Sequence, residues 1–278
     1  MGNLARMVSR GLFVLMTLAL VAVAAFPLYW MALSASLPIG SLFTTTPTFI
    51  PQAHIFKTLA SVFHNSMLTQ WLANSAVIAA GTAVLSLAMG ILAAYALSRF
   101  RFRGRGAFGF LLFATQMLPE ALIIVPLYSL FLGLGLLNGL TGLVLVNVAF
   151  VMPIVAWIIK GAIDAVPVEL EEAAQIDGCS RFATLGTVVV PIIMPSLAAG
   201  AVIAFFHGWN EFMFASTFLQ DKAIWPASVG IASFIGDLSA PMDEVMAASL
   251  VYTIPAVAFF LIAQRRVVAG LTAGSVKG

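Results

Sequence analysis

The sequence has 278 residues, of which 62% are hydrophobic and 9% are charged, and its mean hydropathy is +1.06. A soluble domain carries roughly 45–50% apolar and about 25% charged residues, so a water-soluble globule of this length could not bury so much apolar surface. The composition also excludes a disordered chain, a collagen repeat and a disulfide scaffold, since the chain has one cysteine. With a net charge of +2 and only short arginine clusters, a nucleic-acid partner is not indicated. We expect an all-α integral membrane protein.

Six apolar stretches are long enough to cross a bilayer, whose hydrocarbon layer of about 30 Å takes roughly 20 helical residues. The expected transmembrane spans are residues 12–33, 72–97, 107–132, 140–159, 188–214 and 245–263. The segment Gly133–Gly139 is rich in glycine and also holds an asparagine, which predicts a turn between the third and fourth spans. We expect residues 1–278 to form a single transmembrane domain of six helices.

Basic residues predict the orientation of these spans. Eleven of the thirteen Lys and Arg residues fall in the two tails and in the loops after the second and fourth spans, which share one side of a six-span chain. Lys57 and Lys222 fall on the other side. Since cytoplasmic loops carry the excess of Lys and Arg, both termini are expected in the cytoplasm.

The long cytoplasmic loop, residues 161–187, carries the most specific pattern. Its segment Pro167–Gly178 begins with proline and acidic residues, as helix N-termini do, and ends at a glycine, which makes a left-handed turn without steric cost. A second short amphipathic piece has apolar residues spaced by three from Phe182 to Val188 and ends at Pro191. We expect a helix–turn–helix that docks into a partner's groove with an arginine at its edge. An ordinary capped interfacial helix with solvated acids is the alternative.

This loop contains Glu172-Ala173-Ala174, three residues, Gly178, nine residues and then Val188-Val189-Val190-Pro191. The motif resembles the E-A-A-x3-G-x9-I-x-L-P signature of ABC importer permeases. Further stretches are similar to the carbohydrate branch, namely to the smaller permease of maltose-type systems: Gln116–Pro119, Pro126–Tyr128, Gly208–Phe212, Gln264–Arg266 and Gly270–Gly278. The resemblance covers the chain from Phe26 onward. Departures are mild, because Val188 and Val190 replace larger aliphatic residues and Cys179 takes a position that is usually alanine.

The resemblance implies a type I ABC importer permease fold, in which the cytoplasmic loop is a coupling helix that sits in a cleft of an ATPase subunit. Glu172 would pair with a basic group of that subunit, and Gly178 would make the turn. The residues expected to take part in ATPase coupling are Glu169, Glu172, Ala173, Ala174, Asp177, Gly178, Arg181 and Pro191.

Energy for transport is expected from outside this chain. A nucleotide-binding P-loop needs Gly-Lys before Ser or Thr, and no lysine here follows a glycine. The resemblance therefore implies two separate ATPase subunits that bind ATP and Mg²⁺, a homologous second permease that completes a heterodimer, and a solute-binding protein outside. This chain is expected to be a multi-pass subunit in a bacterial inner membrane, surrounded by lipid, with no catalytic residue, cofactor or metal of its own.

Ionisable groups inside spans are costly in lipid, so they are expected to face a cavity or a partner. Sugars bind through aromatic ring faces and through amide and carboxylate groups, and the fifth span holds the densest such cluster. The candidate substrate-pathway residues are Gln116, Glu120, His207, Trp209, Asn210 and Glu211, with Asn74, Tyr128, Asn147 and Trp157 as weaker candidates. The alternatives are a helix–helix hydrogen bond for Glu120 and an interfacial aromatic belt for the fifth span.

The outer loop 220–244 resembles the family's periplasmic loop that reaches toward the binding protein. Its candidate contacts are Trp225, Asp237, Asp243 and Glu244, and a plain solvated hairpin is the alternative. His54 and His64 lie in the other outer loop without further metal-ligating residues, so a metal site there is not indicated.

The most specific hypothesis is a permease of an ATP-driven importer for a sugar, polyol or sugar conjugate. One alternative is a permease of the same architecture for amino acids, phosphate or metals, against which the C-terminal tail and the third span argue. Others are a membrane-embedded enzyme and an ion-gradient transporter that acts without an ATPase. The sequence shows neither an inverted repeat nor paired intramembrane ionisable groups that would favour these.

Overall fold

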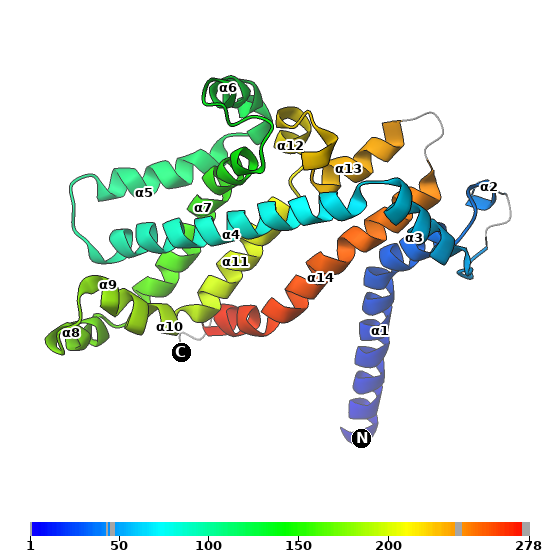
Figure 1. Ribbon diagram of the computed structural model, residues 1–278. Helices are drawn as coiled ribbons and strands as arrows, with labels where there is room; N and C mark the ends of the chain where they lie inside the picture. The colour runs from blue at the N-terminus through cyan, green and yellow to red at the C-terminus, as the bar shows by residue number, and fades with distance from the viewer. Residues whose placement is uncertain (1, 43, 45–47, 237–240, 274–278) are drawn as a thin grey trace. The chain divides into compact units, whose positions relative to one another are not determined.

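The computed structural model describes residues 2–42, 44, 48–236 and 241–273, and every regular element in these ranges is a helix (Figure 1). The α-helices are α1 (Gly2–Ala35), α2 (Ile39–Leu42), α3 (His54–Asn65), α4 (Leu68–Arg99), α5 (Arg105–Ala114), α6 (Glu120–Gly133), α7 (Leu140–Asp164), α8 (Val168–Ile176), α9 (Arg181–Thr184), α10 (Val190–Ile192), α11 (Met194–Trp209), α12 (Met213–Phe218), α13 (Ala227–Ser233) and α14 (Met242–Ala273). The remaining turns are the 3₁₀-helices η1 (Thr115–Met117), η3 (Lys222–Ile224) and η4 (Phe234–Gly236) and the π-helix η2 (Leu185–Val189). The all-α class predicted from composition is confirmed.

Contacts within the chain group it into two units. The first consists of Met1–Leu68 and Ile231–Ile254, and the second of Thr69–Gly230 and Pro255–Gly278. The prediction of a single domain over residues 1–278 stays a prediction.

Among the described residues, four helices are long and apolar enough to cross a membrane: Ser9–Ala35, Leu68–Arg99, Leu140–Asp164 and Met242–Gln264. Two further stretches pass the same test only as bent pairs, Arg105–Met117 with Glu120–Gly133 and Arg181–Ile192 with Met194–Phe218. Six spans therefore result only if each bent pair crosses the membrane once.

The third expected span, residues 107–132, is not one continuous helix in the structure. The chain bends by 104° between η1 and α6, where Leu118 is extended, with φ −82° and ψ 121°. Proline disfavours the helical conformation of the residue before it and has no N–H for the helix ladder, so Pro119 explains the break. The practical result is that Glu120 becomes the first residue of a helix, α6, instead of a mid-helix residue.

The fifth expected span, residues 188–214, is also bent and interrupted in the structure. The helix bends by 84° around Ile193, and a second interruption at Asn210–Phe212 separates α11 from α12. Pro195 explains the first bend, because a proline ring inside a helix clashes with the carbonyl four residues earlier, here that of Pro191.

The core of the second unit lies among α4, α7 and α11, whose buried faces carry small and β-branched residues. One buried cluster includes Val151 and Val155 of α7 with Leu197 and Ala204 of α11. Gly208 lets α11 approach α4 closely, since a Cβ built there would lie 2.9 Å from the Cα of Ala79. This close packing holds the polar end of α11 in place.

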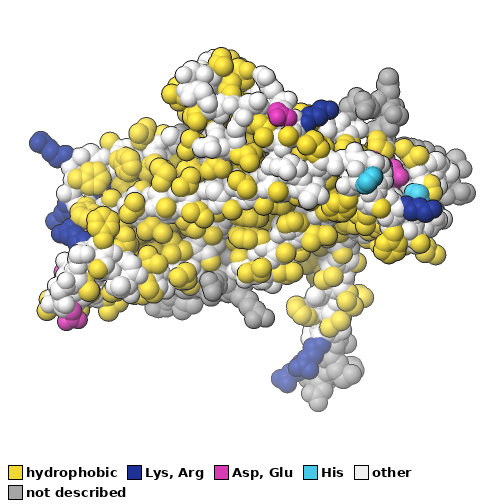
Figure 2. Space-filling model, viewed as in Figure 1, with side chains coloured by type: hydrophobic (Ala, Val, Ile, Leu, Met, Phe, Trp, Pro, Cys, Tyr) yellow, Lys and Arg dark blue, Asp and Glu magenta, His cyan; other side chains and the backbone are white. Residues whose placement is uncertain are grey.

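In the first unit, α1 leaves most of the apolar side chains before its last turn uncovered. Phe13 and Val23, for example, are 72% and 73% exposed, and Figure 2 shows hydrophobic side chains along the helices with Lys and Arg near their ends. Apolar surface of this extent is stable against lipid and not against water.

Candidate functional site

The first candidate site is a polar cluster where the broken helices α6 and α11 approach α7. The Nδ1 atom of His207 lies 2.8 Å from Oδ1 of Asn147, and the amide nitrogen of Asn147 donates to the carbonyl of Leu143 at 2.8 Å. Because an amide oxygen can only accept, Nδ1 of the imidazole is the donor to Oδ1. Nε2 then faces Glu120, whose Oε1 lies 3.5 Å away. The break before Pro119 is what brings the Glu120 carboxylate to this histidine.

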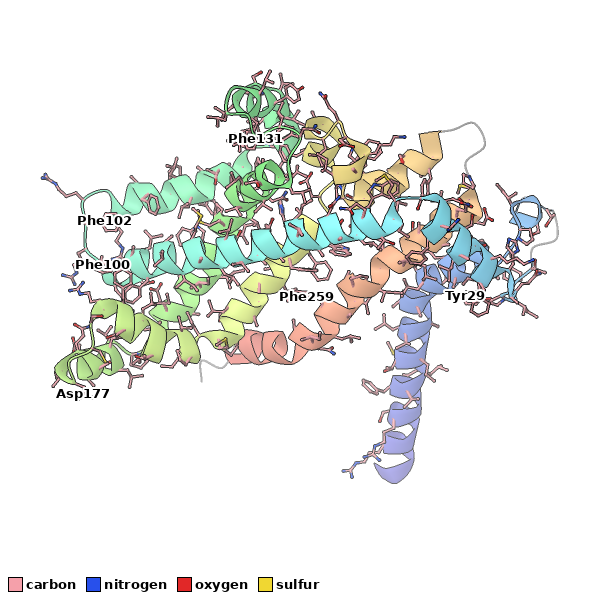
Figure 3. The ribbon with its side chains drawn as sticks, in the orientation of Figure 1. Tyr29, Phe100, Phe102, Phe131, Asp177 and Phe259 are labelled. Atoms are coloured by element: carbon pink, nitrogen blue, oxygen red, sulfur yellow. The ribbon has the colours of Figure 1, made fainter. Side chains whose placement is uncertain are left out.

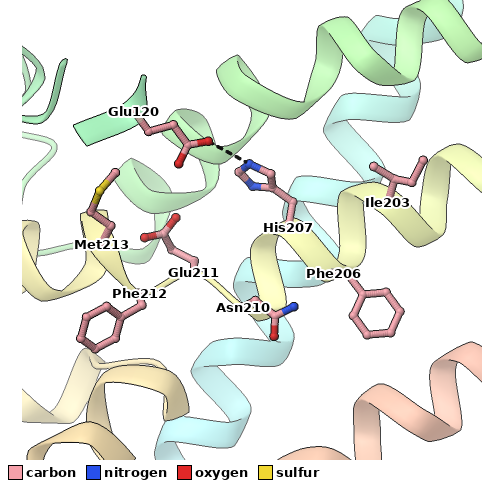
Figure 4. Close-up of a pocket in the computed structure, with 8 residues that line it drawn as sticks. All are labelled: Glu120, Ile203, Phe206, His207, Asn210, Glu211, Phe212 and Met213. Atoms are coloured by element: carbon pink, nitrogen blue, oxygen red, sulfur yellow. Dashed lines mark ion pairs between the residues drawn. The ribbon is translucent and has the colours of Figure 1, made fainter. Parts of the chain in front are cut away.

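The cluster borders an open pocket of about 500 Å³. Figure 4 shows the Glu120–His207 pair on one side of it and the rings of Phe206 and Phe212 on the other. The lining residues are Glu120, Ile203, Phe206, His207, Asn210, Glu211, Phe212 and Met213. The pocket thus combines aromatic faces with a carboxylate, an imidazole and an amide, which is the combination that binds the apolar faces and the hydroxyls of a polyhydroxylated solute.

Glu211 also has a structural task that the sequence did not reveal. The residue is 6% exposed, and its Oε1 accepts hydrogen bonds from the backbone N–H groups of Phe214 at 2.7 Å and Ala215 at 3.3 Å. The Ser228 hydroxyl donates to its carbonyl. A carboxylate at a helix start satisfies free N–H groups and interacts favourably with the helix dipole, so Glu211 caps α12.

Two predicted pathway residues lie outside the pocket lining. Trp209 is 2% exposed and stacks on Phe205, with 5.6 Å between ring centroids. The Gln116 amide donates to the carbonyl of Phe150 at 2.9 Å. Of the predicted pathway set, the structure therefore brings together four residues: Glu120, His207, Asn210 and Glu211. Asn147, a weaker candidate, joins them through the histidine.

The second candidate site is the loop between α7 and α11, and it has the helix–turn–helix form that the sequence predicts. The helix α8 begins after Pro167, and Gly178 takes the left-handed conformation with φ +90°. The Ser180 hydroxyl then caps α9 by accepting from the N–H of Ala183 at 3.2 Å. In Figure 3 Asp177 marks the tip of this loop.

The side chains of the loop divide into an outer and an inner set. The exposed members of the predicted coupling set are Glu169, Glu172, Ala173, Asp177, Gly178, Arg181 and Pro191, while Ala174 is half-buried. Between them, Ile176 is 86% and Phe182 is 78% exposed. The outer surface therefore presents carboxylates around two uncovered apolar side chains, as a docking element does.

Sequence reasoning missed the one carboxylate of α8 that points inward. Glu171 is 3% exposed and pairs with Arg99 at the end of α4, with Nε 2.6 Å from Oε1. The signal was available in the helical spacing, since Glu171 lies three residues before the half-buried Ala174 and shares its face. Its partner, 72 residues earlier in the chain, could not be read from that spacing.

The candidate binding-protein contacts lie in both units, and each described one contacts a partner inside its own unit. In the second unit Trp225 donates from Nε1 to the carbonyl of Leu219 at 3.2 Å. In the first unit Asp243 lies 3.9 Å from His54, and Glu244 accepts from the Ser61 hydroxyl at 2.6 Å. Asp237 lies outside the described residues. Within the described part of the chain, no three His, Cys, Asp or Glu side chains gather as a metal-binding group.

Broken apolar helices beside a polar pocket are typical of membrane transport proteins. Residues 86–272 match the family described as binding-protein-dependent transport system inner membrane component, and the chain belongs to that family. It is therefore a multi-pass inner-membrane transport permease and not an enzyme.

Two relatives are permease proteins named for the transport of a sugar and of a sugar conjugate. The chain is 34% identical over 277 residues to a trehalose/maltose transport system permease protein of Thermococcus litoralis, with 97% of each chain covered. It is 34% identical over 254 residues to a sulfoquinovosyl glycerol transport system permease protein of Agrobacterium fabrum, with 91% of this chain and 89% of that one covered. The fold is also similar to a bacterial ABC transporter involved in the import of alginate, with a TM-score of 0.75 and 23% identity over 94% and 96% of the two chains.

Proposed function

We propose that this protein is the permease subunit that passes a sugar, polyol or sugar conjugate from an external binding protein into the cytoplasm, driven by a separate ATPase. The observation that carries the proposal is the exposed acidic helix α8. The chain turns after it at Gly178, which is in the left-handed conformation, and continues through α9, η2 and α10 into α11. A loop of this form couples a soluble motor to membrane helices because its outer surface is free to dock while its ends are parts of the spans.

The pocket beside His207 supports a polyhydroxylated solute. Glu120 and Asn210 offer hydrogen-bond acceptors and donors, and the ring of Phe212 is 47% exposed. Neither lysine nor arginine is among the lining residues. The relatives with sugar and sugar-conjugate names point the same way.

The assembly and orientation form part of the proposal. Eleven of thirteen basic residues on one side of six spans support cytoplasmic termini and a cytoplasmic α8. The absence of a Gly-Lys pair supports a separate ATPase that holds ATP and Mg²⁺, and the resemblance to ABC importer permeases implies two copies of it. A homologous second permease would supply the other wall of the open pocket.

The experiment is reconstitution of the permease with its second permease, ATPase and binding protein in proteoliposomes. Uptake of labelled saccharides and ATPase stimulation by the loaded binding protein are measured for the native chain and for Gly178→Pro and Glu172→Lys. Both changes are expected to abolish stimulated ATPase and uptake. The control is Arg101→Ala, at an exposed loop residue outside the predicted coupling set. This variant is expected to keep both stimulated ATPase activity and uptake.

Two results would contradict the proposal. The first is full uptake by both loop variants, which would remove the coupling role from α8. The second is uptake by this chain without any ATPase, which would favour an ion-gradient transporter. Stimulation by amino acids, phosphate or metals in place of saccharides would refute the solute class alone.

The pocket is tested separately with Glu120→Gln and His207→Ala. Loss of a hydrogen bond to the solute raises KM for uptake about tenfold for each 1.4 kcal/mol, while the amount of assembled complex stays unchanged. Ser129→Ala on the exposed face of α6 is the matched control, because its hydroxyl bonds only to the Val125 carbonyl of its own helix.

A further inference from the structure

The inward face of the loop holds a buried ion pair that joins α8 to α4. Arg99 and Glu171 lie with Nε 2.6 Å from Oε1, and their side chains are 13% and 4% exposed. The second carboxylate oxygen, Oε2, accepts from the Tyr95 hydroxyl at 2.9 Å. Both oxygens of Glu171 are therefore bonded to residues near the C-terminal end of α4.

Arg99 extends the link to the end of α7. Its Nη2 donates to the carbonyl of Ile163 at 2.9 Å and to that of Val166 at 2.8 Å. The first carbonyl belongs to the last turn of α7, where it also accepts from the backbone N–H of Val166 at 3.0 Å, and the second belongs to the connection into α8. The Arg99 guanidinium, on α4, is therefore hydrogen-bonded both to the end of α7 and to Glu171 in the first turn of α8.

The geometry favours a stiff connection over a solvated contact. Glu171 lies in the first turn of α8 and Arg99 in the last turn of α4, so each charge has the favourable sign for its own helix dipole. Removing either partner of a buried pair leaves an uncompensated charge without water, which makes separation of the two helices costly. Exposed pairs, which water replaces cheaply, do not resist displacement in this way.

A second contact holds the other side of the loop to the same turn. The Arg181 guanidinium of α9 lies 4.8 Å from the centre of the Phe100 ring, and that ring packs edge-on against Tyr95 at 5.8 Å. Figure 3 labels Phe100 where α4 ends, beside the loop. Both short helices of the loop are therefore tied to one point of α4.

We propose that the cluster of Arg99, Glu171 and Tyr95 transmits movement of the docking loop to α4, so that α8 and the cytoplasmic end of α4 move as one body. These are positioning residues, because they act through the loop and touch neither the solute nor the nucleotide. The inference rests on the proposed function, since it needs a motor that displaces α8. It adds which span receives that displacement.

The test compares solute transported per ATP hydrolysed in the reconstituted complex. Glu171→Gln and Tyr95→Phe are expected to leave co-purification with the ATPase unchanged. Glu171→Gln should lower the transport-to-ATP ratio at least fivefold, and Tyr95→Phe about twofold. Arg99→Lys, which keeps the charge opposite Glu171, should retain more than half of the ratio. Arg101→Ala, two residues further in the exposed loop, should match the native chain.

A native ratio in an assembled Glu171→Gln complex would overturn the inference. Assembly and coupling that fall in proportion in Glu171→Gln and Tyr95→Phe would also overturn it, because a merely structural role predicts that result. If the native complex itself fails to couple ATP hydrolysis to uptake, the proposed function fails first. The two failures are therefore distinguishable.

A spectroscopic measurement tests the same claim without transport. Spin labels are placed on the native Cys179 of the loop and on a cysteine introduced at Leu92, which is 53% exposed on α4. The distance between the labels should stay the same in nucleotide-free and ATP-bound complexes and should broaden in Glu171→Gln. A shift of the native distance on ATP binding would overturn the single-body movement.

Discussion

Replacing Gly208 by alanine tests whether close approach of α11 to α4 positions the pathway site. A Cβ at this position would lie 2.9 Å from the Cα of Ala79, 3.0 Å from Oγ1 of Thr82 and 3.1 Å from the carbonyl of Ile78. Two of these atoms belong to the α4 backbone and cannot rotate away, so the helices must separate. Overpacking of this kind costs about 1–3 kcal/mol.

The matched control is Gly161→Ala in the last turn of α7, where nothing lies within 4 Å of a built Cβ. Alanine also gains up to about 1 kcal/mol of helix propensity over glycine, and this gain applies at both positions. The difference between the two variants therefore isolates the steric cost. We expect the Gly208 variant to be less stable than the Gly161 variant by about 1–3 kcal/mol.

The assay is reversible unfolding of the purified chain in mixed detergent micelles, followed by tryptophan fluorescence. Because Gly208 follows His207, the variant should also raise KM for uptake in the reconstituted complex, whereas Gly161→Ala should not. Equal unfolding free energies for the two alanine variants would refute the close packing of α11 against α4.

Two further predictions concern the polar groups that fix neighbouring segments, both measured by the same unfolding assay. Glu211→Ala removes the acceptor for the N–H groups at the start of α12 and should cost about 1–2 kcal/mol as a lost helix cap; an unchanged stability would show that the cap contributes nothing. Asn74→Ala removes two donations of 2.9 Å to the carbonyls of Ala223 and Trp225 and should cost about 1–3 kcal/mol by leaving two half-buried carbonyls without this donor. For Asn74 the control is Gln70→Ala, which removes the side-chain neighbour of that amide and leaves both carbonyl bonds in place.

The sequence by itself determined the features that follow from local rules. Composition and long apolar runs specify helices in lipid, because a backbone in hydrocarbon must satisfy its hydrogen bonds within the segment. The helix–turn–helix form of the loop was predicted correctly. A proline followed by acidic residues starts a helix, and glycine at position 178 adopts the left-handed conformation without steric cost. The break before Glu120 was also encoded locally in Pro119, because proline disfavours the helical conformation of the residue before it.

Only the tertiary structure decided which side chains share a site. Glu120, Asn147 and His207 come from three helices, and nothing in any one of them specifies the distances between them. The inward turn of Glu171 depends on Arg99, and the capping role of Glu211 depends on where α11 stops. The physical reason is the distance along the chain over which each interaction acts. Helix starts and ends follow from neighbours a few residues apart, whereas the pairing of buried charges follows from packing between segments that lie far apart in the chain.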